Sequence, residues 1–288
     1  VDGGESWFQV ARMAEGDDPA VMVVKTLQAD CTISGQHYAV KGTDSEIIYL
    51  APKPPADYEP STSFFSDGEK LHLQVWKPGT YEVKTAAGKS RTLEVNTLPA
   101  TKELEGPWNV NFPQGLGAPD SILMDKLIPL NEHPEPGVKY FAGTAVYSTT
   151  IQVDKDLLQE ENTLWLDLGN VQVMAEVFVN GKLAANLWKP PYRCPLSGFV
   201  NEGENMLEVK VANLWVNRLI GDEQLPKDSE RYPEGNLKKW PEWLEKGEPS
   251  PTGRIAFTTW NLWKKDAPLQ PSGLVGPVLL RISRTVQF

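Results

Sequence analysis

Three short segments of the chain place aromatic rings beside amide and guanidinium side chains: WKPPYR (188–193), NLWVNR (213–218) and TWNLW (259–263). Sugars present apolar C–H faces and polar edges, so flat rings next to hydrogen-bonding groups suit them. If a sugar binds, we expect tryptophan and tyrosine to stack on it and asparagine and arginine to donate hydrogen bonds. The candidate residues are Trp188, Tyr192, Arg193, Trp215, Asn217 and Arg218.

Packing is the competing role for every aromatic residue in these segments. We predict that Trp108 and Trp165 belong to a core or to packing between domains, and that Trp240 and Trp243 form a further pair with the same two alternatives. Arg218 and Asp222 are four residues apart, and they are expected to form an ion pair that fixes a loop rather than a ligand site. We therefore expect binding residues where an aromatic residue lies at the end of a strand, beside a cluster of polar residues.

Catalysis finds little support in the sequence. The three histidines, His37, His72 and His133, make no metal pair, and no Gly-x-Ser-x-Gly elbow is present. Carboxylates that a glycosidase could use are read as solvated loop acids; they are Glu132, Glu135, Asp222, Glu223 and Glu242. We predict no catalytic residue, no metal site and no cofactor, and no ligand spacing predicts a structural calcium.

Composition sets the class of protein. A net charge of −10 with no basic stripe argues against nucleic acid and anionic membrane surfaces as partners. No apolar run approaches the length of a membrane span, and the opening VDGGES shows no signal peptide, so the sequence is read as a mature form or an excised piece. Cys31 and Cys194 are expected to be buried thiols in different domains.

Short strand patterns fill residues 1–98. Apolar or β-branched runs occur at residues 7–13, 21–27, 37–41 and 46–50, and alternation is clearest at 71–75, 80–84 and 91–95. The turns Lys77-Pro78-Gly79 and Ala87-Gly88-Lys89 join these last three runs. We predict a small immunoglobulin-like β-sandwich over residues 1–98, followed by a proline-punctuated linker.

Residues 99–288 predict a second, larger sandwich. Strands are expected at 144–153, 164–168, 175–179, 182–188, 207–211, 255–263 and 278–282, and Asn180-Gly181 is the strongest hairpin signal. The segment of about 221–251 carries five prolines and many charges, so it is read as a loop insertion with one short helix within 236–246. The fold class is all-β, with a jelly roll as the second domain.

Residues 103–288 also resemble a known family. The run ELEGPWNVNFPQGLG, the hairpin LGNVQVMAEVFVNGKLAANLWKPPYRCPL, the segment NLWVNRLIGDE and the ending PSGLVGPVLL occur in the order found in the galactose-binding-like β-sandwich of the large α-L-rhamnosidases of glycoside hydrolase family 106. The sugar-binding jelly roll of family 2 enzymes is a more distant relative. In the rhamnosidases catalysis belongs to glutamates of a barrel domain, and this chain has no α/β alternation that would encode a barrel.

The resemblance implies a non-catalytic accessory region of a periplasmic or secreted glycoside hydrolase. Its expected partners are a carbohydrate and the catalytic barrel domain of the same polypeptide. A free-standing carbohydrate-binding module is the main alternative. A complete small glycosidase and a protein-interaction sandwich are further alternatives, because sandwiches host many functions.

Overall fold

The computed structural model describes residues 7–10, 24, 26–33, 36–43, 46–49, 61–66, 68, 70–84 and 88–287. The chain divides into two compact units, Val1–Pro60 and Ser61–Phe288. Each unit is described by itself.

The described residues of the first unit contain two antiparallel strand pairs. β1 (Trp7–Gln9) pairs with β4 (Ile47–Tyr49), and β2 (Thr26–Ile33) pairs with β3 (Gln36–Thr43). Val10 and Ile48 are buried, and Leu27 and Val40 pack against them. Most of the predicted strand at 21–27 and the side chain of Cys31 lie outside the described residues.

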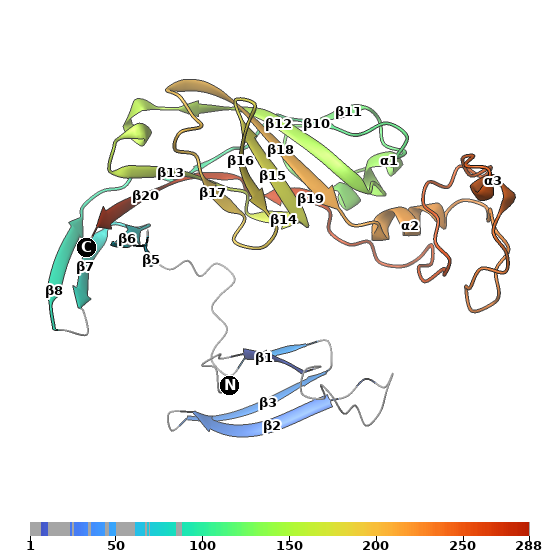
Figure 1. The fold of residues 1–288 in the computed structure, drawn as a ribbon, viewed down its shortest axis with the longest axis horizontal. Coiled ribbons are helices and arrows are strands. Elements are labelled where there is room, and N and C mark those ends of the chain that lie inside the picture. Colours follow the sequence, from blue (N-terminus) through green and yellow to red (C-terminus); the bar gives the residue numbers. More distant parts are fainter. Residues whose placement is uncertain are drawn as a thin grey trace. The chain divides into compact units, whose positions relative to one another are not determined.

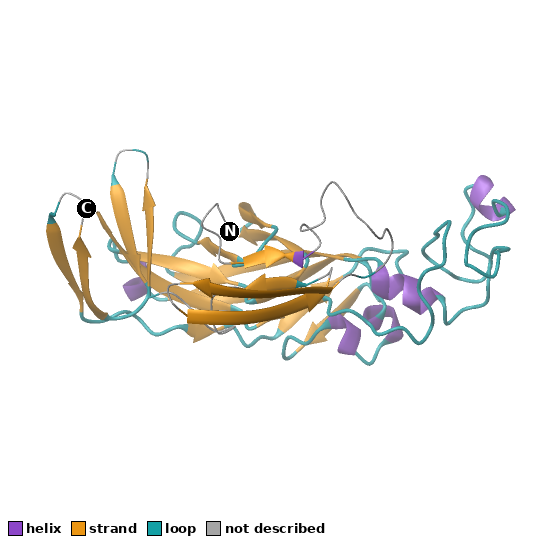
Figure 2. Cartoon of the chain, turned by 90° about the horizontal axis from the view of Figure 1, so that it is seen from below, coloured by secondary structure: helices purple, strands orange, loops and turns teal. Residues whose placement is uncertain are grey.

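Two six-stranded sheets form the frame of the second unit (Figures 1 and 2). The strands of the first sheet, in spatial order, are β11 (Ser121–Met124), β10 (Trp108–Asn111), β12 (Gly143–Val153), β18 (Gly203–Asn213), β15 (Met174–Val179) and β16 (Lys182–Leu187). Those of the second are β17 (Arg193–Pro195), β13 (Asn162–Asp167), β20 (Leu279–Gln287), β6 (Leu71–Val75) and β5 (Thr62–Ser66), with β9 (Lys102–Glu103) paired to β20. The prediction of an all-β sandwich is confirmed.

Smaller elements connect these sheets. The strand pairs are β7 (Gly79–Lys84) with β8 (Ser90–Val95), and β14 (Asn170–Gln172) with β19 (Gly273–Gly276). The helical turns are η2 (Leu130–Glu132), α1 (Pro136–Lys139), η3 (Lys155–Leu158), α2 (Val216–Asp222) and α3 (Glu242–Glu245). α2 was not predicted, and the predicted helix within 236–246 is reduced to the four residues of α3.

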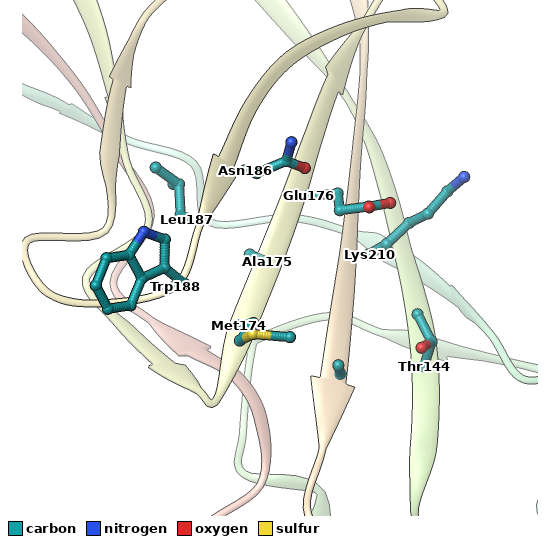
Figure 3. A pocket seen from close by; sticks show the side chains of 9 residues that line it. Thr144, Met174, Ala175, Glu176, Asn186, Leu187, Trp188 and Lys210 are labelled. Carbon is teal, nitrogen blue, oxygen red and sulfur yellow. The ribbon is translucent and has the colours of Figure 1, made fainter.

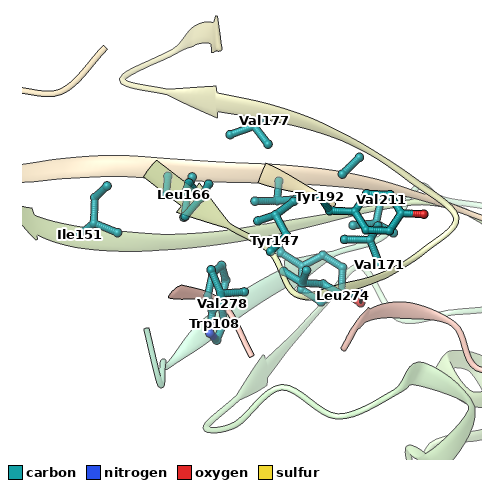
Figure 4. Close-up of a cluster of buried hydrophobic side chains, with 14 of the residues drawn as sticks. Trp108, Tyr147, Ile151, Leu166, Val171, Val177, Tyr192, Val211, Leu274 and Val278 are labelled. Atoms are coloured by element: carbon teal, nitrogen blue, oxygen red, sulfur yellow. Dashed lines mark hydrogen bonds between the residues drawn. The ribbon is translucent and has the colours of Figure 1, made fainter. Parts of the chain in front are cut away.

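The alternating strands send one set of apolar side chains into a single core (Figure 4). Trp108, Tyr147 and Leu166 are fully buried there, so the core role predicted for Trp108 is confirmed. The Tyr147 hydroxyl accepts a hydrogen bond from the backbone N–H of Leu274, and burial raises the pKa of Tyr147. Gly273 has φ +87°, and a Cβ there would collide with that hydroxyl, so only glycine fits.

The predicted hairpin at Asn180-Gly181 is confirmed. β15 and β16 flank it, and both residues have positive φ (52° and 77°), as a tight hairpin turn requires. Asn180 Nδ2 donates to Asn205 Oδ1 at 2.8 Å, and the backbone N–H of Met206 donates to Asn180 Oδ1. The asparagine thus ties the hairpin to the start of β18.

The division between the units lies at residues 60/61, whereas the sequence predicted a boundary at 98/99. β6 pairs with the last residues of β20, from Arg284 to Gln287, so residues from Ser61 onward belong to the larger unit. The buried residues Leu73, Val75 and Val95 form a small core of their own beneath the β7–β8 hairpin. The immunoglobulin-like character of residues 1–98 stays a prediction.

The predicted insertion at about 221–251 is longer in the structure. Between α2 and β19, residues 223–272 contain loops and α3, and the predicted strand at 255–263 is wrong. The backbone N–H groups of Ile255 and Ala256 donate to the Asp222 carboxylate instead of to a neighbouring strand. At these two residues side-chain hydrogen bonds replace a strand ladder, whereas around Trp260 the segment keeps only an isolated antiparallel bridge with Asn236.

Candidate functional site

The outward face of the first sheet carries the candidate site. Ala175, Val177 and Val179 of β15 point into the core, so Met174 and Glu176 point outward by strand alternation. On β18 the same alternation exposes Lys210 and Ala212 while Val209 and Val211 are buried. This face is a mixture of apolar and charged groups.

A groove of about 400 Å³ lies on this face (Figure 3), and we name it the sheet groove. Its lining residues come from four neighbouring strands and the loop after β16; they are Thr144, Met174, Ala175, Glu176, Asn186, Leu187, Trp188, Lys210 and Ala212. In the sheet register Glu176 lies opposite Lys210 on one side and opposite Asn186 on the other. A carboxylate, an ammonium and an amide therefore cross the groove in one row.

Trp188 provides the aromatic surface of the sheet groove. Its side chain is 66% exposed, and it follows the last residue of β16. Lys189 Nζ lies 5.0 Å from the centroid of its ring, and Lys210 Nζ lies 4.3 Å from the ring centroid of Phe178. The arrangement offers a flat ring, apolar neighbours and hydrogen-bonding groups, which suits binding; it contains no nucleophile paired with a base.

The structure separates Tyr192 and Arg193 from Trp188. Tyr192 is buried in the main core, and its hydroxyl donates to the backbone oxygen of Val173 at 2.9 Å. Arg193 Nη2 lies 3.3 Å from Asp167 Oδ2, and its guanidinium lies over the ring of Trp76. Neither lines the sheet groove, so the proposed stacking by Tyr192 does not fit its burial.

Trp215, Asn217 and Arg218 lie at α2. Trp215 is half exposed, whereas Asn217 is buried and both ends of its amide bond the backbone of Gln270. Arg218 Nε lies 3.0 Å from Asp222 Oδ1, which confirms the predicted ion pair. Asn217 and Arg218 therefore fix the base of the insertion, and of the six candidates only Trp188 lines the sheet groove.

Some of the candidate carboxylates are exposed to solvent, and the others contact arginine side chains. Glu132, Glu135 and Glu242 are exposed, while Asp222 is buried with both oxygens taken by Arg218 and two backbone N–H groups. Burial raises the pKa of Glu223, but hydrogen bonds from Arg254 and Asn261 and the charge of Arg254 outweigh it, so the pKa lies below its ordinary value. Glu223 is therefore held ionised and is not poised as a catalytic acid.

Cys194 is a buried thiol, and burial raises its pKa to about 12. Among the described residues no three histidine, cysteine, aspartate or glutamate side chains come together as a metal cluster. None of the described helices is long and apolar enough to cross a membrane.

Residues 120–252 match the family model described as "Glycosyl hydrolase 2 galactose-binding domain-like". The second unit therefore contains a galactose-binding-like domain. A solved rhamnosidase from Novosphingobium sp. PP1Y is 28% identical and superposes with a TM-score of 0.54 over 82% of this chain. The chain is also 43% identical, over 217 residues, to a Formosa agariphila protein named "Putative beta-glucuronidase".

The chain spans only a small share of the length of these relatives. It spans 18% of the Formosa agariphila protein and 25% of the rhamnosidase chain, although 75% and 82% of its own length is covered. The relatives therefore carry far more sequence than the two units described here.

Sequence reasoning about the galactose-binding-like domain missed most of the sheet groove. Glu176 and Lys210 appeared only as the polar positions of two alternating strands, and Asn186 stood two residues before Trp188 without comment. The pairing of β15 with both β16 and β18 brings these three side chains together. The alternation of each strand shows that these side chains face outward. It does not show that they are neighbours, because the order of strands in a sheet is set by long-range pairing.

Proposed function

We propose that this chain is a non-catalytic part of a larger glycoside hydrolase of the α-L-rhamnosidase type, family 106, and that the sheet groove contacts glycan. The similarity to the rhamnosidase supports the enzyme type, since it covers most of this chain and a quarter of that enzyme. The small share of each relative supports a catalytic domain elsewhere in the same polypeptide, against which this region packs. An extracytoplasmic location goes with that proposal.

The observation that carries the proposal is the exposed ring of Trp188 at the edge of a groove with polar groups. A tryptophan that is 66% exposed contributes little to the fold, whereas stacking on a sugar ring would remove its face from water. Asn186 and Lys210 can donate hydrogen bonds to hydroxyl groups, and Glu176 can accept them.

The experiment is calorimetric titration of the chain with L-rhamnose, galactose, glucuronic acid and plant polysaccharides. We expect binding to one of these classes and a loss of about fivefold in affinity for Trp188→Ala, since an aromatic contact contributes about 1 kcal/mol. Trp215→Ala is the matched control, because Trp215 is also exposed but lies outside the groove. If no sugar of the panel binds, or if both variants lose affinity equally, the glycan contact is excluded from the proposal.

A free-standing carbohydrate-binding module is the second candidate. It is favoured by one observation: every residue of the sheet groove belongs to the single unit Ser61–Phe288. Tight binding by this chain alone, unchanged when the catalytic domain is present, would support the module. Hydrolysis of aryl glycosides by the purified chain would instead support a complete small enzyme.

A further inference from the structure

The insertion contains a second groove, of about 540 Å³, formed entirely by residues 227–264. We name it the insertion groove. The side chains on which the inference depends are Lys227, Tyr232, Lys238, Trp260, Leu262 and Lys264. None of them lines the sheet groove, and of the segments that the sequence offered for sugar binding only TWNLW (259–263) contributes, through Trp260 and Leu262.

The charge of the insertion groove is opposite to that of the chain. Its lining includes four basic side chains, Lys227, Arg231, Lys238 and Lys264, against one acidic side chain, Glu234. The whole chain has a net charge of −10. A positive lining favours an anionic ligand over a neutral one.

A neighbouring hollow, lined by residues between 227 and 248, does not share this excess of basic side chains. It is lined by five acidic side chains and three basic ones, and two of its lysines are paired: Lys239 with Glu230 and Lys246 with Glu242. The third, Lys227, lines the insertion groove as well. In the described part of the chain, Lys227 and Lys264 have no such carboxylate partner in contact. The insertion groove therefore keeps cationic groups available to a ligand.

Two exposed aromatic rings stand beside these cations. Tyr232 and Trp260 are each 52% exposed, and Lys238 Nζ lies 5.4 Å from the centroid of the Tyr232 ring. Leu262, at 53% exposed, adds an apolar contact. Rings next to ammonium groups match a sugar ring that bears a negative charge.

The frame that holds these rings is cross-linked. Arg231 donates to the backbone oxygens of Gly235 and Thr258, and Trp260 Nε1 donates to the backbone oxygen of Glu234 at 3.1 Å. Gly235 has φ +94°, and a Cβ there would collide with the Asn261 carbonyl, so the two loops meet backbone to backbone. Trp260 is thus oriented before any ligand arrives, which lowers the entropic cost of binding.

We propose that the insertion groove binds an anionic sugar residue of a glycan, carrying either a carboxylate or a sulfate ester. Tyr232 and Trp260 contact the ring, and Lys238 and Lys264 face its charge. The insertion groove shares no lining residue with the sheet groove, so this proposal does not depend on the function proposed for the sheet groove.

The test titrates the full chain with three oligosaccharides of equal length, built from glucuronic acid, from a sulfated sugar and from glucose. We expect the acidic oligosaccharides to bind about tenfold or more tightly than the glucose oligosaccharide, with an affinity that falls as salt rises. The comparison of glucuronic acid with the sulfated sugar identifies which anion is preferred. Equal affinity for acidic and neutral oligosaccharides would overturn the proposal.

Variants locate the binding. Lys264→Gln should weaken acidic binding about two- to fivefold, because an exposed charge contact contributes about 0.5–1 kcal/mol. Lys246→Gln is the control, since Lys246 is equally a surface lysine but is paired with Glu242. Trp260→Ala should remove binding, and Tyr232→Ala repeats that test without removing the hydrogen bond that joins the loops.

Two further outcomes decide the assignment. Trp215→Ala, at an exposed tryptophan outside both grooves, should leave acidic binding unchanged. If polyglutamate binds as tightly as the acidic oligosaccharides and loses affinity in the same variants, the surface recognises anions in general and the carbohydrate assignment is overturned.

Discussion

Asp167 shows how single residues join the sandwich to the segment before it. Its Oδ2 lies 3.3 Å from Arg193 Nη2 and 3.2 Å from Arg281 Nη1, and both guanidinium groups lie over the ring of Trp76. The side chains of Asp167 and Arg281 are each only 10% exposed. One carboxylate therefore forms ion pairs with two largely buried guanidinium groups that both lie over the Trp76 ring.

We predict that Asp167→Asn lowers the free energy of unfolding by about 3–5 kcal/mol, because it removes the buried carboxylate that both guanidinium groups contact. The Oδ1 contact with the Gly169 N–H can be kept by asparagine, so the loss reports on charge. Glu161→Gln is the control: its 3.8 Å contact with Arg284 is exposed and should contribute about 0–1 kcal/mol. Urea denaturation measures both, and equal changes would contradict the charge argument.

The roles of single residues could be predicted from the sequence where a residue type has one dominant role. Trp108 was expected in the core and is fully buried, and Arg218 was expected to pair with Asp222 and does. Tyr192 carries the same chemical groups as a stacking tyrosine, yet its hydroxyl bonds Val173 inside the core. Side-chain chemistry alone could not tell these two uses apart, because burial depends on which strands come together.

Among the secondary-structure elements, those of the insertion were predicted least well from the hydrophobic pattern of the sequence. It is attached to α2 at its base: Asp222 accepts from Ile255 and Ala256, and Arg254 Nη1 lies 2.6 Å from Glu223 Oε1. Apolar residues at 255–263 suggested a strand, but the Asp222 carboxylate satisfies the N–H groups of Ile255 and Ala256, and only an isolated bridge pairs Trp260 with Asn236. The hairpin at Asn180-Gly181 was predictable because its turn geometry is local.

The Glu223–Arg254 contact predicts a pH dependence of the insertion. Because the pKa of Glu223 is below its ordinary value of 4.5 in the folded chain, its contribution to stability is complete above that value and is lost as pH falls through the lower, folded pKa. Glu223→Gln should therefore be less stable than the wild type at pH 7, and the difference should shrink below about pH 4.

Thermal unfolding of the two proteins at pH 7, 5 and 3.5 measures this difference. Glu242→Gln is the control, because Glu242 is exposed and its contact with Lys246 lies at the surface. A difference between wild type and Glu223→Gln that stays constant down to pH 3.5 would exclude a role for the ionised carboxylate.

The whole molecule is organised by the long-range pairing of β6 with β20. Residues 284–287 lie beside residues 72–75, and Gln74 Nε2 donates to Ser283 Oγ at 3.1 Å. Trp165 Nε1 donates to the same hydroxyl, and Trp76 packs on Trp165 with ring centroids 5.2 Å apart. Composition and a proline-punctuated segment suggested a boundary at residue 98, but strands this far apart in sequence pair across it.

This pairing predicts the result of truncation. A chain of residues 61–288 should unfold in one cooperative transition, whereas residues 99–288 alone lose the partner of β20 and the cover over Trp165 and Arg281. Uncovering this surface costs about 3 kcal/mol, which lowers Tm by about 6–12 °C for a domain of this size. Differential scanning calorimetry of both chains gives the comparison. Equal Tm values would show that residues 61–98 add no stability and that the boundary lies at residue 98, as composition suggested.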